Sequence, residues 1–242
     1  MKMMLIDAGN SRVKWAMVDG GMWLQQNVLE NTYATALIMA FSKLLPPDRV
    51  LISNVAGENM AQLLSAACAA WGCPIEFIVA QTKQCGVHNL YEHPAQLGSD
   101  RWAALIAAWH QEHASCLVVN CGTATTVDAL SAEGEFLGGL ILPGVDMLLS
   151  SLAASAAQLA KPAGVWREFP RNTDDAMVSG SIQATIGAIR LQFEAIAVNG
   201  GVRCLISGGA ADNVQSHLKL PSMRVDNMVL RGLQIIGHER LS

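Results

Sequence analysis

The sequence lacks a basic surface and a segment that could cross a membrane. Lys and Arg do not cluster in any run, and the formal net charge is -4. Because proteins that bind nucleic acid backbones need a clustered basic face, we expect no DNA or RNA partner. Its apolar stretches are interrupted before they reach the roughly 20 residues of a membrane-spanning helix. Met1 to Asp7 contain too short an apolar run for a signal peptide, so we expect a cytoplasmic protein without a membrane partner.

Cysteine pairs with the spacing of a metal site are also missing. The six cysteines include no Cys-x-x-Cys pair, and a cytosolic chain keeps its thiols reduced. Cys68 and Cys73 could be combined with His88 and His93 as a zinc set, but their spacing is loose for such a site. We interpret them as buried thiols and loop histidines, and we expect no zinc.

Aromatic and charged residues are scarce, with two Tyr, five Phe and a charged fraction of 15% against 51% hydrophobic residues. This composition is typical of an aliphatic, Ala-rich globular protein rather than a disordered chain. A length of 242 residues suits one large domain or two small ones.

The predicted elements occur in two similar series. The first begins with three strands joined by turns, then alternates helices and strands, and ends with a long loop and a helix. The second begins again with three strands and continues with two helices, a strand and a closing helical segment. The first series is predicted at residues 3–7, 13–18, 22–29, 34–45, 50–55, 58–71, 75–79, 81–98 (the loop) and 99–113. The second is predicted at 116–120, 125–130, 136–142, 145–159, 173–197 and 202–207.

This repetition predicts a duplicated α/β unit with its boundary near Ala114. We expect an N-terminal domain over residues 1–114 and a C-terminal domain over 115–242. Each would hold a mixed five-stranded sheet flanked by helices, and a cleft between the copies would be the natural ligand site. Because long loops in compact domains tend to be functional, residues 81–98 are expected to contribute to that site.

Two strand-turn-strand hairpins carry the clearest functional signal. Asp7-Ala8-Gly9-Asn10 in the first copy aligns with Asn120-Cys121-Gly122-Thr123 in the second. Glycine at such a turn lets backbone N–H groups approach phosphate oxygens without an intervening Cβ. The pair therefore predicts a phosphate clamp.

Charged residues on the first hairpin suit phosphoryl transfer. Asp7, at the end of the first strand, could hold Mg²⁺ directly or through water, and Lys14 could neutralise phosphate charge. The competing interpretation of Asp7 is a carboxylate that only caps the turn.

A second group of candidates lies where the long loop meets the following helix, at Gly98-Ser99-Asp100-Arg101. Asp100 could accept a proton from an attacking hydroxyl, and Arg101 could bind an anionic group of the substrate or the transferring phosphate. The competing interpretation makes Ser99 or Asp100 the residue that caps the helix. Further along, Gly208-Gly209 after a strand could pack against a purine, although such a pair is often a plain connection.

Taken together and in chain order, these motifs resemble those of the type III pantothenate kinases, which belong to the actin-like (ASKHA) superfamily with ribonuclease H-like domains. The resemblance runs from residue 5 to about 210 and also covers bacterial regulators of the Bvg accessory factor type. The motifs that carry it are Asp7 to Lys14, Gly98 to Arg101, Gly122 to Asp128, Gly138-Gly139, Pro143-Gly144 and Asn172-Thr173.

The resemblance implies ATP-dependent phosphorylation of pantothenate to 4'-phosphopantothenate, the first step of coenzyme A biosynthesis, in a homodimer that uses Mg²⁺. It implies that Asp100 is the proton acceptor and that Asp7 is a metal ligand. The residues implied to bind ATP are Asp7, Ala8, Gly9, Asn10, Ser11, Arg12, Val13, Lys14 and Thr123. Those implied to line the pantothenate pocket are Tyr91, Gly98, Ser99, Asp100, Arg101 and Thr173.

One position departs from the pattern of the family. Asn120 stands where the family commonly has an Asp that coordinates a monovalent cation such as K⁺ or NH₄⁺. Asn keeps an oxygen ligand but loses the charge, so we hypothesise a weaker cation requirement or none.

Two alternatives remain open from the sequence. One is a kinase of the same superfamily that acts on another small alcohol or sugar, which the residues of the pantothenate loop disfavour. The other is a regulatory accessory protein that keeps the fold without turnover, which the retention of Asp7, Asp100 and Arg101 disfavours.

Overall fold

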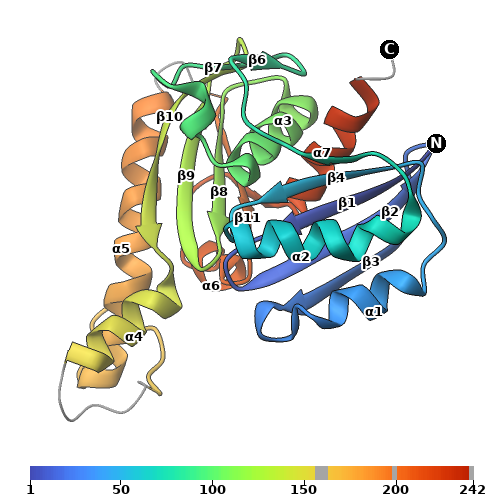
Figure 1. Cartoon of the computed structure of the whole chain (residues 1–242). Helices are drawn as coiled ribbons and strands as arrows, with labels where there is room; N and C mark the ends of the chain where they lie inside the picture. Colours follow the sequence, from blue (N-terminus) through green and yellow to red (C-terminus); the bar gives the residue numbers. More distant parts are fainter. Residues whose placement is uncertain (156–162, 198–200, 240–242) are drawn as a thin grey trace. The chain divides into compact units, whose positions relative to one another are not determined.

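The structure, a computed structural model, describes residues 1–155, 163–197 and 201–239 (Figure 1). The chain forms two compact units. The first holds residues 1–111 and the segment that begins at Asn227, and the second holds residues 112–226. Among the described residues, every helix is too short or too polar to span a membrane.

The first unit contains a five-stranded sheet in the order β3-β2-β1-β4-β5. β1 pairs with β2, and β2 with β3, in antiparallel fashion, whereas β4 and β5 continue the sheet in parallel. Gly20 and Gly21, with φ of 53° and 95°, form the tight turn between β2 and β3, a conformation that favours glycine. The strands are β1 (Lys2–Ala8), β2 (Arg12–Asp19), β3 (Met22–Glu30), β4 (Arg49–Asn54) and β5 (Ile75–Phe77).

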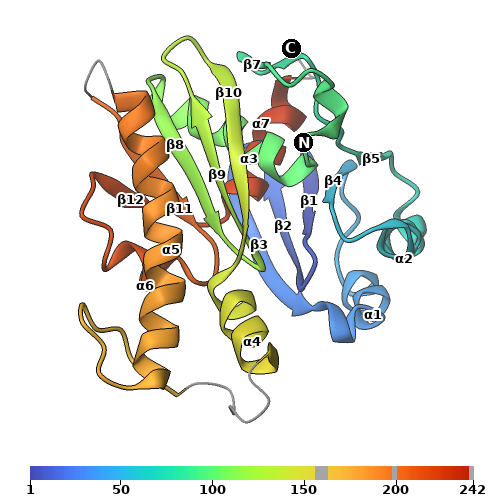
Figure 2. The same ribbon diagram turned by 90° about the vertical axis from the view of Figure 1, so that its left-hand side faces the viewer.

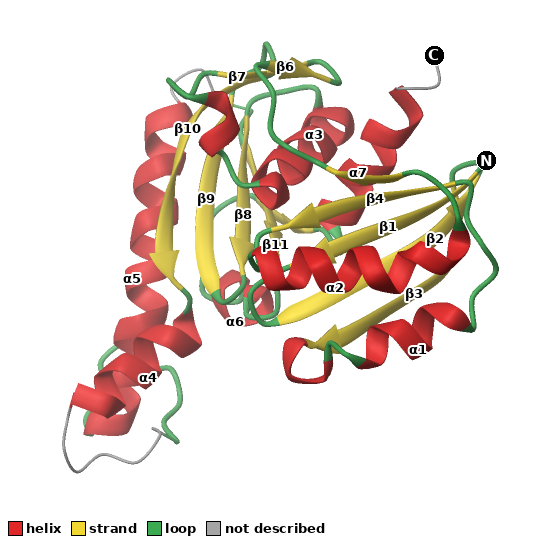
Figure 3. Cartoon of the chain, viewed as in Figure 1, coloured by secondary structure: helices red, strands yellow, loops and turns green. Residues whose placement is uncertain are grey.

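Helices cover both faces of this sheet (Figures 1 and 3). Successive side chains of a strand point to opposite faces, so Met4 and Ile6 of β1 pack in one core with Leu37 and Phe41 of α1. Met3 faces the other side, where α7 packs against β1 and β4. The helices of this unit are η1 (Asn31–Tyr33), α1 (Ala36–Ser42), α2 (Glu58–Cys68), η2 (Ala69–Trp71), η3 (Pro94–Gln96), α3 (Ser99–Glu112) and α7 (Met228–Glu239).

The second unit repeats this plan, with its strands in the order β12-β11-β8-β9-β10. Figure 2 shows α5 lying along this sheet, and Ile182 and Ile189 of α5 join Val119 and Val127 in a buried core. The elements are β8 (Cys116–Cys121), β9 (Ala124–Leu130), β10 (Glu135–Pro143), α4 (Val145–Ser155), α5 (Thr173–Ile196), β11 (Arg203–Ser207), α6 (Ala211–Gln215) and β12 (Ser222–Arg224).

The two units share one topology. β8, β9 and β10 form an antiparallel meander like β1, β2 and β3, and β11 and β12 extend the sheet in parallel as β4 and β5 do. The predicted α/β class with mixed sheets flanked by helices is confirmed.

Several elements differ from the expectations. The loop predicted over 81–98 contains a short antiparallel pair, β6 (Lys83–Gln84) and β7 (Val87–Asn89), as well as η3. The three-residue strand β12 was not predicted, because so short a segment shows no periodicity. Of the helix expected over 145–159, residues 156–159 lie outside the described residues.

The division of the chain also differs from the expected one. The boundary falls after residue 111, close to the expected 114, but the segment from Asn227 belongs to the first unit. The physical reason is the packing of α7 on β1 and β4, which continues the first sheet's core rather than the second.

Gly232 permits a close contact between α7 and α3. A Cβ added at Gly232 would overlap the backbone of Ala103 in α3, and a backbone neighbour cannot rotate aside. Gly232→Ala should therefore lower the free energy of unfolding by about 3 kcal/mol, the upper range for overpacking. Chemical denaturation measures this change.

Gly187→Ala is the matched control. Its added Cβ in α5 would meet no atom within 4 Å, so the same substitution should raise stability by roughly 0.5–1 kcal/mol through helix propensity. Similar effects at both glycines would contradict the close-packing explanation.

Candidate active site

Asp7 lies at the end of β1, on the sheet face that Met3 also occupies. Ile6 and Ala8, its neighbours in sequence, point into the opposite core with α1 and α2. In the register of the sheet, Asp7 is flanked by Lys14 on β2 and Ser53 on β4. Side chains at paired positions share a face, so the carboxylate stands between an ammonium and a hydroxyl group.

The turn of the first hairpin has exposed polar residues, and the strand residues on either side of it are buried. Ala8 and Val13 are fully buried, whereas Asn10, Ser11 and Arg12 are exposed and accessible to a ligand. The Gly9 amide donates to the Arg12 carbonyl at 3.0 Å. A Cβ at Gly9 would meet only that carbonyl, at 3.5 Å. The chain therefore leaves space in front of Gly9, as a ligand approaching the backbone requires.

Asp100 lies in the first turn of α3. Its Oδ1 accepts a hydrogen bond from the Arg101 amide at 2.8 Å. A Cβ at Gly98 would lie 2.6 Å from the same oxygen, so glycine at 98 makes room for the carboxylate. The helix begins at Ser99, and therefore neither Ser99 nor Asp100 is the residue that precedes it. The prediction that Ser99 or Asp100 precedes the helix as its cap is therefore wrong. Asp100 satisfies only one amide of the first turn, that of Arg101, which donates to its Oδ1.

Ser53 is a site residue that the sequence analysis missed. Its hydroxyl is fully buried and lies 2.9 Å from the hydroxyl of Ser99, which is also buried. This hydrogen bond joins the end of β4, beside Asp7, to the start of α3, beside Asp100. Ser53 thus connects the two elements that carry the candidate carboxylates.

Both carboxylates have raised pKa values, and the charge of Asp100 acts on Asp7. The pKa of Asp7 is raised from 3.8 to about 7, chiefly by burial; Lys14 acts to lower it, and the charge of Asp100 acts to raise it. Burial also raises the pKa of Asp100, against the lowering effects of the hydrogen bond from the Arg101 amide and the Arg101 charge. Two acids with raised pKa values in one place are typical of a catalytic site.

Arg101 and Tyr91 form the adjoining part of the site. The guanidinium Nη1 donates to the Tyr91 hydroxyl at 3.1 Å, and its carbon lies 5.7 Å from the centre of the Tyr91 ring. Arg101 is buried. Asn89 holds this segment, because its side chain accepts from the Tyr91 amide and donates to the Pro94 carbonyl. The structure therefore brings Tyr91, Asp100 and Arg101 together.

The second hairpin is shaped by close backbone approaches. The Gly144 amide donates to the Thr123 carbonyl, and the Ala210 amide donates to the Cys121 carbonyl, both at 3.0 Å. A Cβ at Gly144 would overlap the Thr123 backbone, and one at Gly208, which has φ of 100°, would overlap that of Cys121. Gly208 is thus required by packing, independently of any contact with a purine.

The remaining predicted residues of the second unit lie at its surface or partly buried. Thr123 is exposed at the turn of the hairpin, and Asn120 is half-buried at the end of β8. Thr173 is exposed at the start of α5, where the Asn172 side chain accepts a hydrogen bond from the Asp175 amide. Whether Thr173 shares a pocket with Tyr91 stays a prediction.

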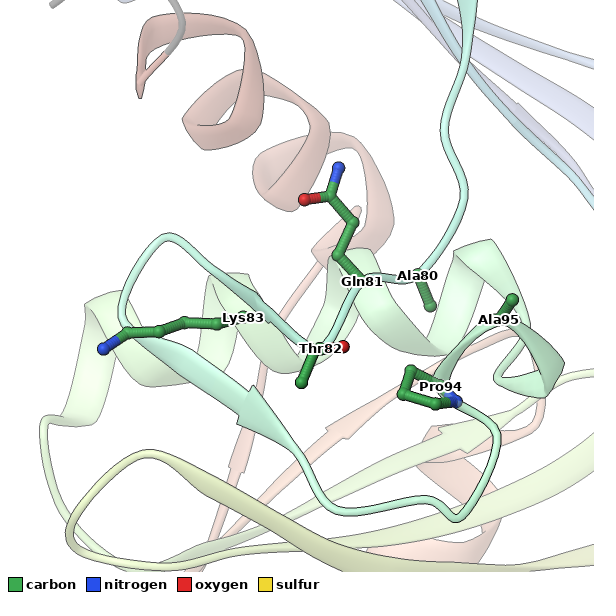
Figure 4. A pocket seen from close by; sticks show the side chains of 6 residues that line it. All are labelled: Ala80, Gln81, Thr82, Lys83, Pro94 and Ala95. Atoms are coloured by element: carbon green, nitrogen blue, oxygen red, sulfur yellow. The ribbon is translucent and has the colours of Figure 1, made fainter.

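An open hollow of about 610 Å³ lies beside the loop of the first unit, and Figure 4 shows the side chains that line it. Its lining comes from two facing segments, and the Lys83 side chain extends away from Pro94. None of the predicted site residues borders it. The lining residues are Ala80, Gln81, Thr82, Lys83, Pro94 and Ala95.

Comparison with known proteins identifies the family. The sequence model of the type III pantothenate kinases matches residues 3–195. The chain belongs to the type III pantothenate kinase family. A relative with this name from Aromatoleum aromaticum is 46% identical over 236 residues, covering 98% of each chain. Another from Nitrosospira multiformis is 44% identical, covering 98% of this chain and 91% of the relative. The resemblance drawn from the motifs is confirmed.

Solved structures share the fold. A Campylobacter jejuni protein assigned to the Baf family of transcriptional activators superposes with a TM-score of 0.64 at 20% identity, covering 99% of this chain and all of that one. The activator of 2-hydroxyisocaproyl-CoA dehydratase from Clostridium difficile, solved with bound ADPNP, gives a TM-score of 0.55 at 10% identity, covering 100% and 96%.

The raised pKa of Asp7 has a consequence for stability. Between pH 3.8 and about 7 the folded chain binds a proton at Asp7 that the unfolded chain has lost, so this group's contribution to stability falls as the pH rises and levels off above 7. Asn mimics the protonated acid. Asp7→Asn should therefore stabilise the protein without nucleotide at pH 8, by up to roughly 4 kcal/mol at about 1.4 kcal/mol per pKa unit.

Thermal melts of the variant and the parent at pH 8 and pH 5 measure this difference. The advantage of Asp7→Asn should shrink as the pH falls from 7 toward 4. Asp146→Asn, at an exposed residue in the first turn of α4, provides the control. A variant less stable than the parent at pH 8 would mean that the Asp7 carboxylate is well solvated.

Proposed function

We propose that this protein transfers the γ-phosphoryl group of ATP to the primary hydroxyl of pantothenate, giving 4'-phosphopantothenate, the first step of coenzyme A biosynthesis. The observation that carries the proposal is the buried carboxylate of Asp7 at the end of the first hairpin strand, on which the charge of Asp100 acts. It occurs in a chain whose near full-length relatives are named type III pantothenate kinases.

Asp100 is the proposed general base. A base in phosphoryl transfer accepts the hydroxyl proton as the new P–O bond forms and the bond to the leaving ADP breaks. Burial raises the pKa of Asp100 and so increases its affinity for that proton. The hydrogen bond from the Arg101 amide occupies Oδ1, which leaves Oδ2 as the oxygen for the substrate.

Asp7 and Lys14 are the proposed partners of the ATP phosphates: Asp7 as a ligand of Mg²⁺ and Lys14 as a neutralising charge. Among the described residues, no group of three or more His, Cys, Asp or Glu is arranged to hold a metal ion. A site with one protein carboxylate fits Mg²⁺, which typically binds one or two carboxylates with phosphate oxygens and water. Bound there, Mg²⁺ would neutralise phosphate charge. The backbone of the first hairpin and Thr123 of the second are the proposed partners of ATP.

The pantothenate pocket is proposed at Tyr91, Gly98 to Arg101 and Thr173. Pantothenate carries a carboxylate, and Arg101 is a buried cation whose planar donors suit that group. The bond from Arg101 to the Tyr91 hydroxyl holds the guanidinium in place. Arg101 therefore orients the substrate while Asp100, the preceding residue, reaches its hydroxyl.

ADP release from ATP and Mg²⁺, measured with and without pantothenate, tests the function. We expect release that depends on pantothenate and a kcat at least ~100-fold lower for Asp100→Asn, in line with general-base magnitudes. Glu58→Gln, at an exposed carboxylate in the first turn of α2, is the matched control and should retain activity. Near-normal turnover of Asp100→Asn would remove Asp100 from the base role.

The same assay separates the alternatives. Turnover with another small alcohol or sugar but not with pantothenate would indicate a different kinase of the superfamily. Absence of turnover with any acceptor would favour a regulatory protein that keeps the fold.

The monovalent cation forms a separate part of the proposal. Asn120 offers an amide oxygen where the family commonly has a carboxylate, so we expect turnover that depends weakly on K⁺ or NH₄⁺ relative to Na⁺. Asn120→Asp should increase that dependence because it restores a charged ligand. Rates measured in the three salts test this, and strong, equal K⁺ activation of both proteins would contradict it.

We also propose that the protein is a homodimer, as the resemblance to the family implies, and that it acts in the cytoplasm, as the sequence analysis predicts. A solution mass equal to a single chain would contradict the dimer.

A further inference from the structure

Asn31 fastens the turn of the first hairpin from one side. It is the first residue of η1, directly after β3. Its side-chain Nδ2 donates to the carbonyls of Gly9 and Asn10, both at 2.9 Å. Its backbone amide donates to the carbonyl of Ser11 at 2.9 Å. One residue therefore binds three successive carbonyls of the turn.

This arrangement fixes the direction of the amides as well. The described residues contain no cis peptide bond, and in a trans peptide the C=O and N–H groups point in opposite directions. Because the carbonyls of residues 9, 10 and 11 point toward Asn31, the amides of residues 10, 11 and 12 point away from it. Successive amides directed to one side form a concave site for an anion.

The side-chain amide of Asn31 is oriented to donate hydrogen bonds to the turn, although this leaves its oxygen without a partner in the described part of the chain. Its Oδ1 is buried and has no hydrogen-bond partner among the described residues, which is unfavourable for a polar atom. Rotating the amide by 180° would place Oδ1 against two carbonyl oxygens, so the carbonyls of the turn determine its orientation. The contact gives the turn its shape while an acceptor remains unsatisfied.

We infer that Asn31 is a positioning residue that directs the amides of the first hairpin toward the phosphates of the nucleotide. The inference rests on the proposed function for the identity of the anion. Asn31 acts through Asn10, Ser11 and Arg12 and contacts no substrate itself. Its loss should therefore affect the nucleotide and leave pantothenate binding intact.

Two variants test this inference, with an exposed neighbour as the control. Asn31→Asp keeps the shape, removes both side-chain donors and adds a negative charge, whereas Asn31→Ala removes the donors without adding a charge. Thr32→Ala changes the next residue of η1, which is exposed. We expect the KM for ATP to rise about tenfold or more in both Asn31 variants, because misdirected amides would lose about one hydrogen bond to a charged phosphate. The KM for pantothenate should change less than about twofold, and Thr32→Ala should match the parent.

Calorimetric titration with ADP and Mg²⁺ provides a readout that needs no turnover. Weaker ADP binding by both Asn31 variants, with pantothenate binding near that of the parent, supports the inference whether or not the loss of the two bonds lowers the melting temperature. If the parent shows no pantothenate-dependent turnover but these variants still lose ADP affinity, the proposed function fails and the positioning role stands. Unchanged ADP affinity, or an equal loss for both ligands with a lower melting temperature, overturns the positioning role.

Discussion

The register of β1 against its two neighbours is the constraint on which the site of the first unit depends. It places Asp7 between Lys14 and Ser53 and leaves Met4 and Ile6 in the core below α1 and α2. Because the side chains of a strand alternate, a slip of one residue would bury the carboxylate in that core and expose the apolar set. The large apolar area on the α1 and α2 side thus holds a poorly solvated carboxylate in place.

The two hairpins are built by different means. In the first, the side chain of Asn31 donates to two carbonyls of the turn, in addition to the backbone bond from Gly9 to Arg12. In the second, the backbones of Gly144 and Gly208 pack directly against the backbone of the hairpin, at Thr123 and Cys121. A duplicated topology therefore does not carry duplicated chemistry. The first copy supplies carboxylates and an ammonium, whereas the second offers an exposed turn of fixed shape.

Local signals made much of the fold and part of the site predictable. An apolar strand followed by a polar residue and glycine marked both hairpins, and the helix was correctly expected to start at Ser99. The roles of Ser53 and Asn31 could not be predicted, because they arise from contacts with residues 46 and 21 to 22 positions away in sequence. A serine ending a strand, or an asparagine after one, is too common to indicate such a contact. The placement of α7 was missed for the same reason, since it depends on distant strands.

The return of α7 to the first sheet has a consequence for biosynthesis. A ribosome releases residues 1–111 first, then the whole second unit, and only then the helix from Met228 to Glu239. Until that helix emerges, the face of β1 and β4 that it covers, including Met3 and Leu51, has no partner from α7. The second unit can therefore be complete before the first, which reverses the usual N-terminal-first order of folding on the ribosome.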